Sequence, residues 1–142
     1  MKFIIVISIL ISTLFAVSVD DVLWVLDGKP SIEQGRVEAR HKGLPIVVVV
    51  IIKDGCVWCD LTVDKTLGEK EVEKAIAKNA VLVFYDFYKE RPAAFKATHT
   101  PTFFFVDTQS GEILDRTEGF LEPYEFQNYL ERAVNLQKRL RR

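Results

Sequence analysis

An unbroken run of seven β-branched residues, Ile46–Ile52, constrains the fold of this chain more than any other feature. Valine and isoleucine lose rotamer freedom in a helix and pack well on a pleated surface, so the run predicts a β-strand. No polar residue alternates along it, which indicates that both faces of the strand are covered. We therefore expect a central strand of an α/β sheet, with chain packed on either side of it.

The segments around this strand predict an alternation of helices and strands. Ser31 is a suitable N-cap for a helix that Gly43 and Pro45 end. Helices are expected over 31–41, 57–66, 70–78 and 123–139, a short helix or loop over 91–98, and strands over 80–87, 102–107 and 112–117. Helices connect the first two strands, which should be parallel, whereas the last two form an antiparallel hairpin. The expected fold class is α/β, a central mixed β-sheet flanked by helices on both faces.

Residues 1–18 are predicted to be a secretory signal peptide that takes no part in the fold. Lys2 precedes an apolar stretch, and the small residues Ala16 and Ser18 follow it in the spacing of a cleavage site. Cleavage is expected after Ser18, with Ala16 as the second choice. The alternative is an uncleaved N-terminal membrane anchor, because the apolar run is near the lower limit for crossing a bilayer. In both cases the domain, residues 19–142, is periplasmic or secreted.

Composition narrows the kind of protein further. A hydrophobic fraction of 49 % in 142 residues is enough for the core of one domain, and no repeat or linker follows Val19. The formal net charge of −1 argues against nucleic acid as a partner. We expect a monomer. The only two cysteines, Cys56 and Cys59, lie close together in the sequence, which favours chemistry over a disulfide-stapled scaffold.

The cysteine pair Cys56-Val57-Trp58-Cys59 begins directly after the turn that ends the central strand. Positions i and i+3 share one face of a helix, so the two sulfurs can join. The start of a helix also offers free N–H groups and a partial positive charge, which stabilise a thiolate and lower the pKa of the Cys56 thiol. We predict a redox-active dithiol in which Cys56, exposed at the tip, attacks, and Cys59, shielded one turn further in, resolves the mixed disulfide.

Other interpretations of the pair remain open. A purely structural disulfide would close so short a loop that it restricts the unfolded chain little. A zinc site would need His41 and His99 as well, and these histidines are far apart in the sequence and form no His-x₃₋₅-His pair. No metal and no cofactor are therefore expected.

Two further motifs carry a resemblance to a known family. Thr100-Pro101-Thr102-Phe103 opens a second apolar strand, and Gly119 precedes the last helix. Together with the cysteine pair, they resemble the thioredoxin superfamily over nearly all of the chain after Trp24. Lys42-Gly43-Leu44-Pro45 and the tryptophan before the second cysteine are similar to bacterial periplasmic thioredoxin-like proteins, including the SoxW-like and thiol–disulfide interchange groups.

The resemblance implies a thioredoxin fold and a set of substrate-binding residues. Pro101 would follow a cis peptide bond and lie against the dithiol. The backbone of Thr100 would pair with an extended substrate peptide. Thr100 and His99 would shape the rim of the site, and His99 is also a possible modulator of the cysteines. Trp58 is a candidate substrate-binding residue that could gate access to the sulfurs, with the covering of apolar surface as the alternative.

The sequence departs from ordinary thioredoxins at three positions. Their buried aspartate is replaced here by Val50, and its lysine partner falls near Leu82. Water or another carboxylate must then take the proton of Cys59, and Asp86 is the candidate substitute. Asp60, one helical turn after Cys56, places a carboxylate on the face of the thiolate and should oppose its formation. A less stable thiolate makes the disulfide harder to reduce, which predicts a reductant.

The predicted function is that of a thiol–disulfide oxidoreductase that reduces protein disulfides outside the cytoplasm. Its partners would be protein thiols and disulfides, and a membrane electron donor or another redox partner would reduce it again. One alternative is a disulfide oxidase or isomerase on the same fold. Another is a non-redox peptide-binding module that uses the groove at Thr100 and Pro101.

Overall fold

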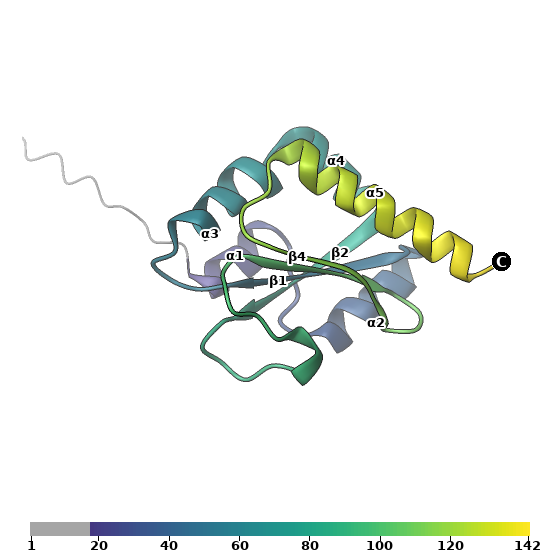
Figure 1. Ribbon diagram of the computed structural model, residues 1–142, viewed down its shortest axis with the longest axis horizontal. Coiled ribbons are helices and arrows are strands. Elements are labelled where there is room, and N and C mark those ends of the chain that lie inside the picture. The colour runs from purple at the N-terminus through teal and green to yellow at the C-terminus, as the bar shows by residue number, and fades with distance from the viewer. Residues whose placement is uncertain (1–17) are drawn as a thin grey trace, which may run out of the picture.

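The computed structural model describes residues 18–142, so the predicted signal peptide falls almost entirely outside the described part. Within this described part, five α-helices and four strands follow one another (Figure 1). The helices are α1 (Val19–Val25), α2 (Ile32–Lys42), α3 (Val57–Leu61), α4 (Lys70–Asn79) and α5 (Pro123–Leu140). The strands are β1 (Ile46–Ile52), β2 (Ala80–Asp86), β3 (Thr102–Asp107) and β4 (Ile113–Glu118). A π-helical segment, Thr62–Leu67, extends α3, and a 3₁₀ turn covers Ala93–Phe95.

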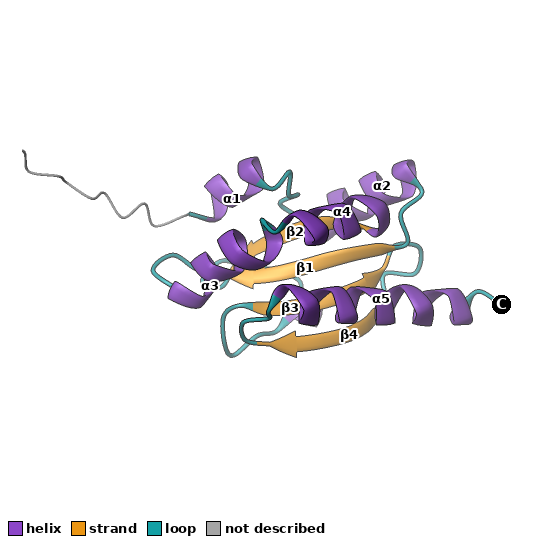
Figure 2. Ribbon diagram, turned by 90° about the horizontal axis from the view of Figure 1, so that it is seen from above, coloured by secondary structure: helices purple, strands orange, loops and turns teal. Residues whose placement is uncertain are grey.

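The strands form one mixed sheet in the order β2-β1-β3-β4. β1 and β2 are parallel, whereas β3 is antiparallel to both β1 and β4. Helices α4 and α5 cover one face of the sheet and α2 covers the other, as Figures 1 and 2 show. The α/β class, the mixed sheet and the helices on both faces are confirmed.

Every residue of β1 is buried, as its unbroken apolar sequence predicts. Val48 and Val50 face the core under α4 and α5, while Val47 and Val49 face the core under α2. Each such side chain contributes about 1.5–3 kcal/mol of burial free energy. β1 is therefore the rigid element from which the residues after Ile52 are positioned.

The ends of α2 also follow the prediction. The Ser31 hydroxyl accepts a hydrogen bond from the backbone N–H of Gln34, and Gly43 ends the helix with a φ of 69°. Glycine tolerates this left-handed conformation because it has no Cβ.

Two local features differ from the sequence-based expectation. Helix α1 was not expected; Ser18 and Asp21 form a capping box at its start, and Val22 anchors it on the sheet. The helix predicted over 57–66 is α-helical only to Leu61 and continues as a π-helix, which ends at Gly68. No helix within residues 18–142 is both long and apolar enough to cross a bilayer.

Candidate dithiol active site

The sheet topology places the dithiol next to the start of β3. β1 and β3 are antiparallel neighbours, and Ile51 pairs with Thr102. The residues that follow β1 and those that precede β3 therefore emerge at the same edge of the sheet. This brings Cys56 against Thr100, although 44 positions separate them in the sequence.

Cys56 is the N-cap of α3, and its sulfur is joined to that of Cys59 in a disulfide. Before it, Gly55 turns the chain with a φ of 67°. The backbone N–H of Cys59 donates to Cys56 Sγ at 3.1 Å. In the reduced protein this N–H and the positive end of the helix both stabilise a thiolate at Cys56. The pair is thus arranged for thiol–disulfide exchange.

The prediction that Cys56 is exposed at the tip overstates its accessibility. Cys56 is 7 % exposed and Cys59 is 2 % exposed, so both are buried and Cys56 is the more accessible of the two. The cause is the segment before β3. The carbonyl oxygen of Thr100 lies 3.7 Å from Cys56 Sγ, and the Thr100 hydroxyl donates to the same sulfur at 3.4 Å.

The Thr100–Pro101 peptide bond is cis, the geometry that the resemblance implies. The carbonyl of Pro101 accepts a hydrogen bond from Gly119 N–H at 2.8 Å, which ties this segment to the end of β4. Gly119 has a φ of 95°, a backbone conformation that residues with a Cβ rarely adopt.

An open groove of about 590 Å³ runs beside the dithiol. It is lined by Trp58, His99, Thr100, Glu118, Gly119 and Phe120. The Trp58 ring is largely exposed and lies 5.7 Å from the Phe120 ring, centroid to centroid. The two predicted rim residues, Thr100 and His99, and the predicted substrate-binding residue Trp58 therefore lie in one groove. Glu118 and Phe120 were missed, and only their proximity to Gly119 in the sequence could have suggested them.

The two predicted modulators occupy different positions. Asp60 lies in the first turn of α3, and its backbone N–H donates to the Cys56 carbonyl at 3.0 Å. The structure gives its carboxylate no contact with either sulfur, so its effect on the thiolate stays a prediction. The His99 ring is exposed, lines the groove and lies 3.3 Å from a Glu118 carboxylate oxygen.

The core behind the dithiol holds no ionic pair at the two positions that distinguish this chain from thioredoxins. Val50 and Leu82 are both buried and apolar. Asp86, at the end of β2, is only partly buried, and its carboxylate accepts from the backbone N–H of Tyr88 at 2.9 Å. A role for Asp86 in proton transfer therefore stays a prediction.

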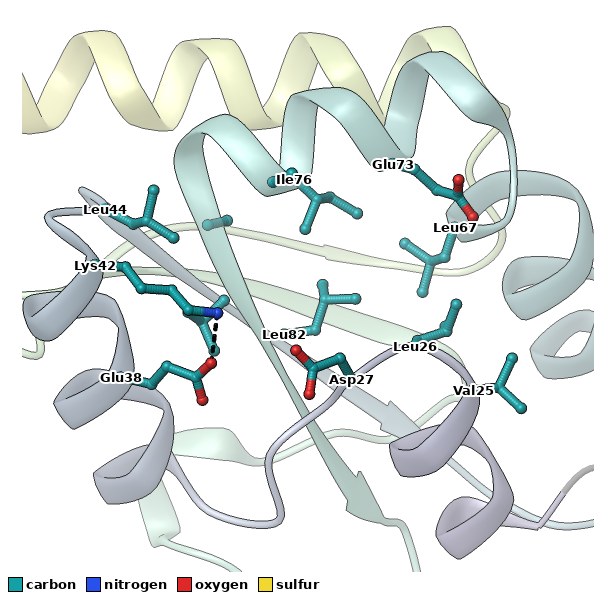
Figure 3. A pocket seen from close by; sticks show the side chains of 13 residues that line it. Val25, Leu26, Asp27, Glu38, Lys42, Leu44, Leu67, Glu73, Ile76 and Leu82 are labelled. Atoms are coloured by element: carbon teal, nitrogen blue, oxygen red, sulfur yellow. Dashed lines mark ion pairs between the residues drawn. The ribbon is translucent and has the colours of Figure 1, made fainter.

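A second cavity, of about 520 Å³, lies away from the dithiol between α1, α2, α4 and the start of β2 (Figure 3). Its walls are largely aliphatic, with Leu26, Leu44 and Ile76 among them. The carboxylates of Asp27 and Glu73 and the Glu38–Lys42 ion pair also line it. No cysteine or histidine lines it. Within residues 18–142, no three His, Cys, Asp or Glu side chains are grouped to hold a metal ion.

Several solved structures share this fold. A thioredoxin from Thermus thermophilus superposes with a TM-score of 0.64 at 19 % identity, over 75 % of this chain and 86 % of its own. The reduced C-terminal domain of DsbD from Neisseria meningitidis gives 0.56 at 19 % identity, over 69 % of this chain and 89 % of its own. The structure titled DsbH Oxidoreductase gives 0.55 at 18 % identity, over 76 % and 84 %. No curated protein sequence matches this chain.

Sequence comparison defines the family directly. Residues 32–134 match the family described as "Thioredoxin-like domain". This range contains the whole sheet, both cysteines and the Thr100–Pro101 segment. The chain is therefore a member of the thioredoxin-like domain family.

Proposed function

We propose that this protein is a thiol–disulfide oxidoreductase that reduces disulfides of other proteins outside the cytoplasm. The observation that carries the proposal is the joining of Cys56 and Cys59 at the start of α3, with the Thr100 hydroxyl against the outer sulfur. The dithiol is the only cysteine pair of the chain. The Cys59 N–H and the Thr100 hydroxyl favour a thiolate at Cys56, and Cys59 is the more deeply buried of the two cysteines.

The reaction consists of two successive thiol–disulfide exchanges. The Cys56 thiolate attacks one sulfur of the substrate disulfide, forms a mixed disulfide and releases the first substrate thiolate, which takes up a proton. Cys59 loses its proton to water or a nearby base such as an ionised carboxylate, and its thiolate attacks Cys56 Sγ. The second substrate thiol then leaves, and the protein holds the Cys56–Cys59 disulfide. Two electrons have passed from the protein to the substrate.

The cycle needs an external reductant. An oxidising compartment does not supply electrons, so we assign this role to a membrane electron donor or another redox partner. The C-terminal domain of Neisseria meningitidis DsbD is known in both a reduced and an oxidised form, and this chain shares its fold. The exported location rests on the predicted signal peptide. Mass spectrometry of the mature protein tests it by showing whether the chain begins after Ala16, after Ser18 or at Met1.

The experiment for the activity is the reduction of a disulfide-containing protein such as insulin, with dithiothreitol as the electron source. The wild-type protein should accelerate the reaction, and Cys56→Ser should abolish the acceleration. Equal rates with and without the wild-type protein would contradict the proposal. A reduction potential well above that of the glutathione pool would instead support an oxidase or isomerase. A partner that binds equally to a Cys56→Ser, Cys59→Ser variant would support a non-redox binding module.

A further inference from the structure

The Thr100 hydroxyl that donates to Cys56 Sγ belongs to a segment, residues 96–100, that forms neither helix nor strand. Fixing the backbone of such a segment costs about 1–2 kcal/mol of conformational entropy per residue, so other contacts must hold it. On the β3 side, the Thr102 hydroxyl donates to the His99 carbonyl at 2.7 Å. Ala97 packs on the core under α2, and further polar contacts come from the edge strand β4.

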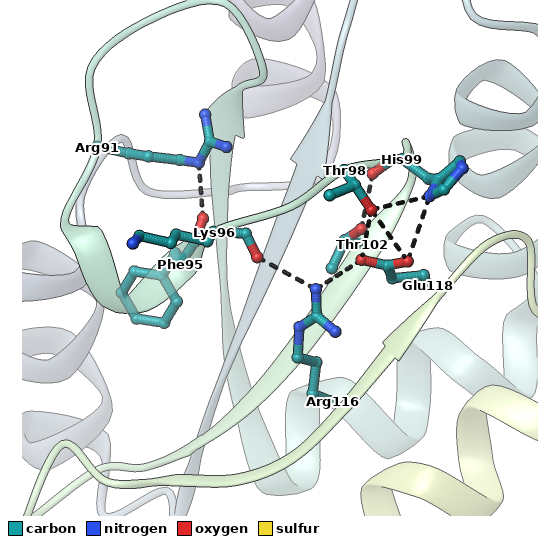
Figure 4. Close-up of polar contacts among 8 residues, drawn as sticks. All are labelled: Arg91, Phe95, Lys96, Thr98, His99, Thr102, Arg116 and Glu118. Atoms are coloured by element: carbon teal, nitrogen blue, oxygen red, sulfur yellow. Dashed lines mark hydrogen bonds and ion pairs between the residues drawn. The ribbon is translucent and has the colours of Figure 1, made fainter.

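Two charged side chains of β4, Arg116 and Glu118, hold the segment from this side (Figure 4). Arg116 Nη2 donates to the Lys96 carbonyl at 3.2 Å and to Glu118 Oε1 at 2.6 Å. The Glu118 carboxylate accepts from the Thr98 hydroxyl, at 3.3 and 3.4 Å from its two oxygens. It also lies 3.3 Å from Nδ1 of His99. One carboxylate therefore joins two consecutive residues of the segment to β4.

The hydrogen bond from Arg116, with smaller contributions from His99 and Thr98, holds the pKa of the Glu118 carboxyl below its usual range. The group is consequently ionised at neutral pH, where thiol–disulfide exchange takes place. Charged acceptors form stronger hydrogen bonds than neutral ones.

We propose that Glu118 is a positioning residue for Cys56: by holding Thr98 and His99, it keeps the Thr100 hydroxyl on Cys56 Sγ. The consequence for the reaction rests on the proposed function. A hydroxyl donates more strongly to a thiolate than to a thiol, so it favours the nucleophilic form of Cys56. Glu118 thus promotes a thiolate through geometry, although its own negative charge opposes one.

Glu118→Gln separates these two effects by their sign. Loss of the negative charge alone lowers the pKa of the Cys56 thiol, whereas loss of the positioning raises it. We expect a rise of about 0.5–1 pH unit, measured by thiolate absorbance in the reduced protein. The reduction potential should become more negative in parallel, because the reduced form loses stabilisation. A fall in the pKa, or no change, would overturn the proposal.

Two control variants show whether the change in the pKa of Cys56 is specific to Glu118 and its contacts. Glu112→Gln removes the same charge from an exposed residue at the other end of the hairpin and should leave the pKa of Cys56 unchanged. Thr98→Val removes one contact of Glu118, together with the 3.0 Å contact of the Thr98 hydroxyl with His99 Nδ1, without changing any charge, and should give a smaller rise. Circular dichroism and thermal unfolding identify any variant that fails to fold. In that case the Thr98→Val result decides, since a rise supports the proposal and no change contradicts it.

A double-mutant cycle tests whether Glu118 acts through Thr100. Thr100→Val removes the hydroxyl and keeps a β-branched side chain of similar size. In that background Glu118→Gln should no longer raise the pKa of Cys56. An equal rise in both backgrounds would contradict the proposed path. The pKa measurement needs no substrate, so inactivity of the wild-type protein towards insulin would refute the proposed function and leave the positioning role of Glu118 to be judged by the titration.

Discussion

The side-chain hydroxyl of Thr100 lies 3.4 Å from the sulfur of Cys56, across 44 positions of sequence. Only the antiparallel pairing of β1 with β3 makes this contact possible, because it brings the end of one strand to the start of the other. The sulfur thus has a donor from its own helix, the Cys59 N–H, and a second donor from the opposite side. Both act on the atom to which we assign the nucleophilic role.

The charge of Asp60 should affect the Cys56 thiolate. Asp60→Lys replaces a negative charge in the first turn of α3 by a positive one, so the pKa of Cys56 should fall by about 0.5–1 pH unit. Thiolate absorbance during a pH titration of the reduced protein measures it. Glu112→Lys, which makes the same change at the far end of the β3–β4 hairpin, serves as the control. If both variants titrate like the wild type, the electrostatic role of Asp60 is wrong.

Asp107 should make the stability of the protein depend on pH in the acid range. Burial by itself would raise the pKa of this carboxyl, but hydrogen bonds from Ser110, from the backbone of Gln109 and from Arg141 outweigh it, so the pKa is lowered. A lowered pKa in the folded state stabilises the protein fully above the ordinary carboxyl pKa of about 4. This stabilisation is lost as the pH falls through the folded-state value.

Asp107→Asn should therefore reduce the free energy of unfolding at pH 7 by about 1–2 kcal/mol. The difference from the wild type should shrink as the pH falls below 4, because the unfolded wild-type chain then takes up the proton first. It should disappear below the lowered pKa of the folded state, where the wild-type carboxyl is neutral like the Asn amide. Urea unfolding across this range provides the measurement, and Glu131→Gln, at an exposed site on α5, is the matched control. A difference that stays constant with pH would show that charge is not the cause.

Gly35 should be required for the contact of α2 with the sheet. A Cβ at this position would meet Val83 Cγ2 and would lie 3.2 Å from Val47 Cγ1. Alanine has the better helix propensity by about 1 kcal/mol, so on propensity alone Gly35→Ala would stabilise the protein. We expect net destabilisation of about 1–3 kcal/mol, because overpacking against β1 and β2 dominates. Gln34→Ala, on the exposed side of the same helix, should change thermal stability little; a stabilised Gly35→Ala variant would contradict the packing argument.

Local patterns predicted most of the architecture. A few adjacent residues were enough to predict β1, from its apolar run. The same holds for the ends of α2, which Ser31 and Gly43 mark. The π-helix after α3 was not predictable in this way, because six residues are too few for the apolar spacing to distinguish a π-helix from an α-helix. Helix α1 was missed because its Ser18 cap directly follows the apolar run of the predicted signal.

The candidate site could be predicted only where a motif marks it. Cys56, Cys59 and Thr100 belong to such motifs. Glu118 and Phe120 enter the groove because the edge strand β4 ends beside it, a consequence of strand order that no local pattern records. The low exposure of Cys56 has the same origin, since the segment that covers it comes from a distant part of the chain.

Trapping of a mixed disulfide tests the central claim, that Cys56 attacks and Cys59 resolves, most directly. Reduced Cys59→Ser protein mixed with a disulfide-containing protein should form a covalent complex that a thiol reductant dissolves, and peptide mapping should place the link at Cys56. The reduced Cys56→Ser protein should form little or no such complex, because Cys59 is 2 % exposed. A complex formed through Cys59 but not through Cys56, or no complex with either variant, would contradict the account.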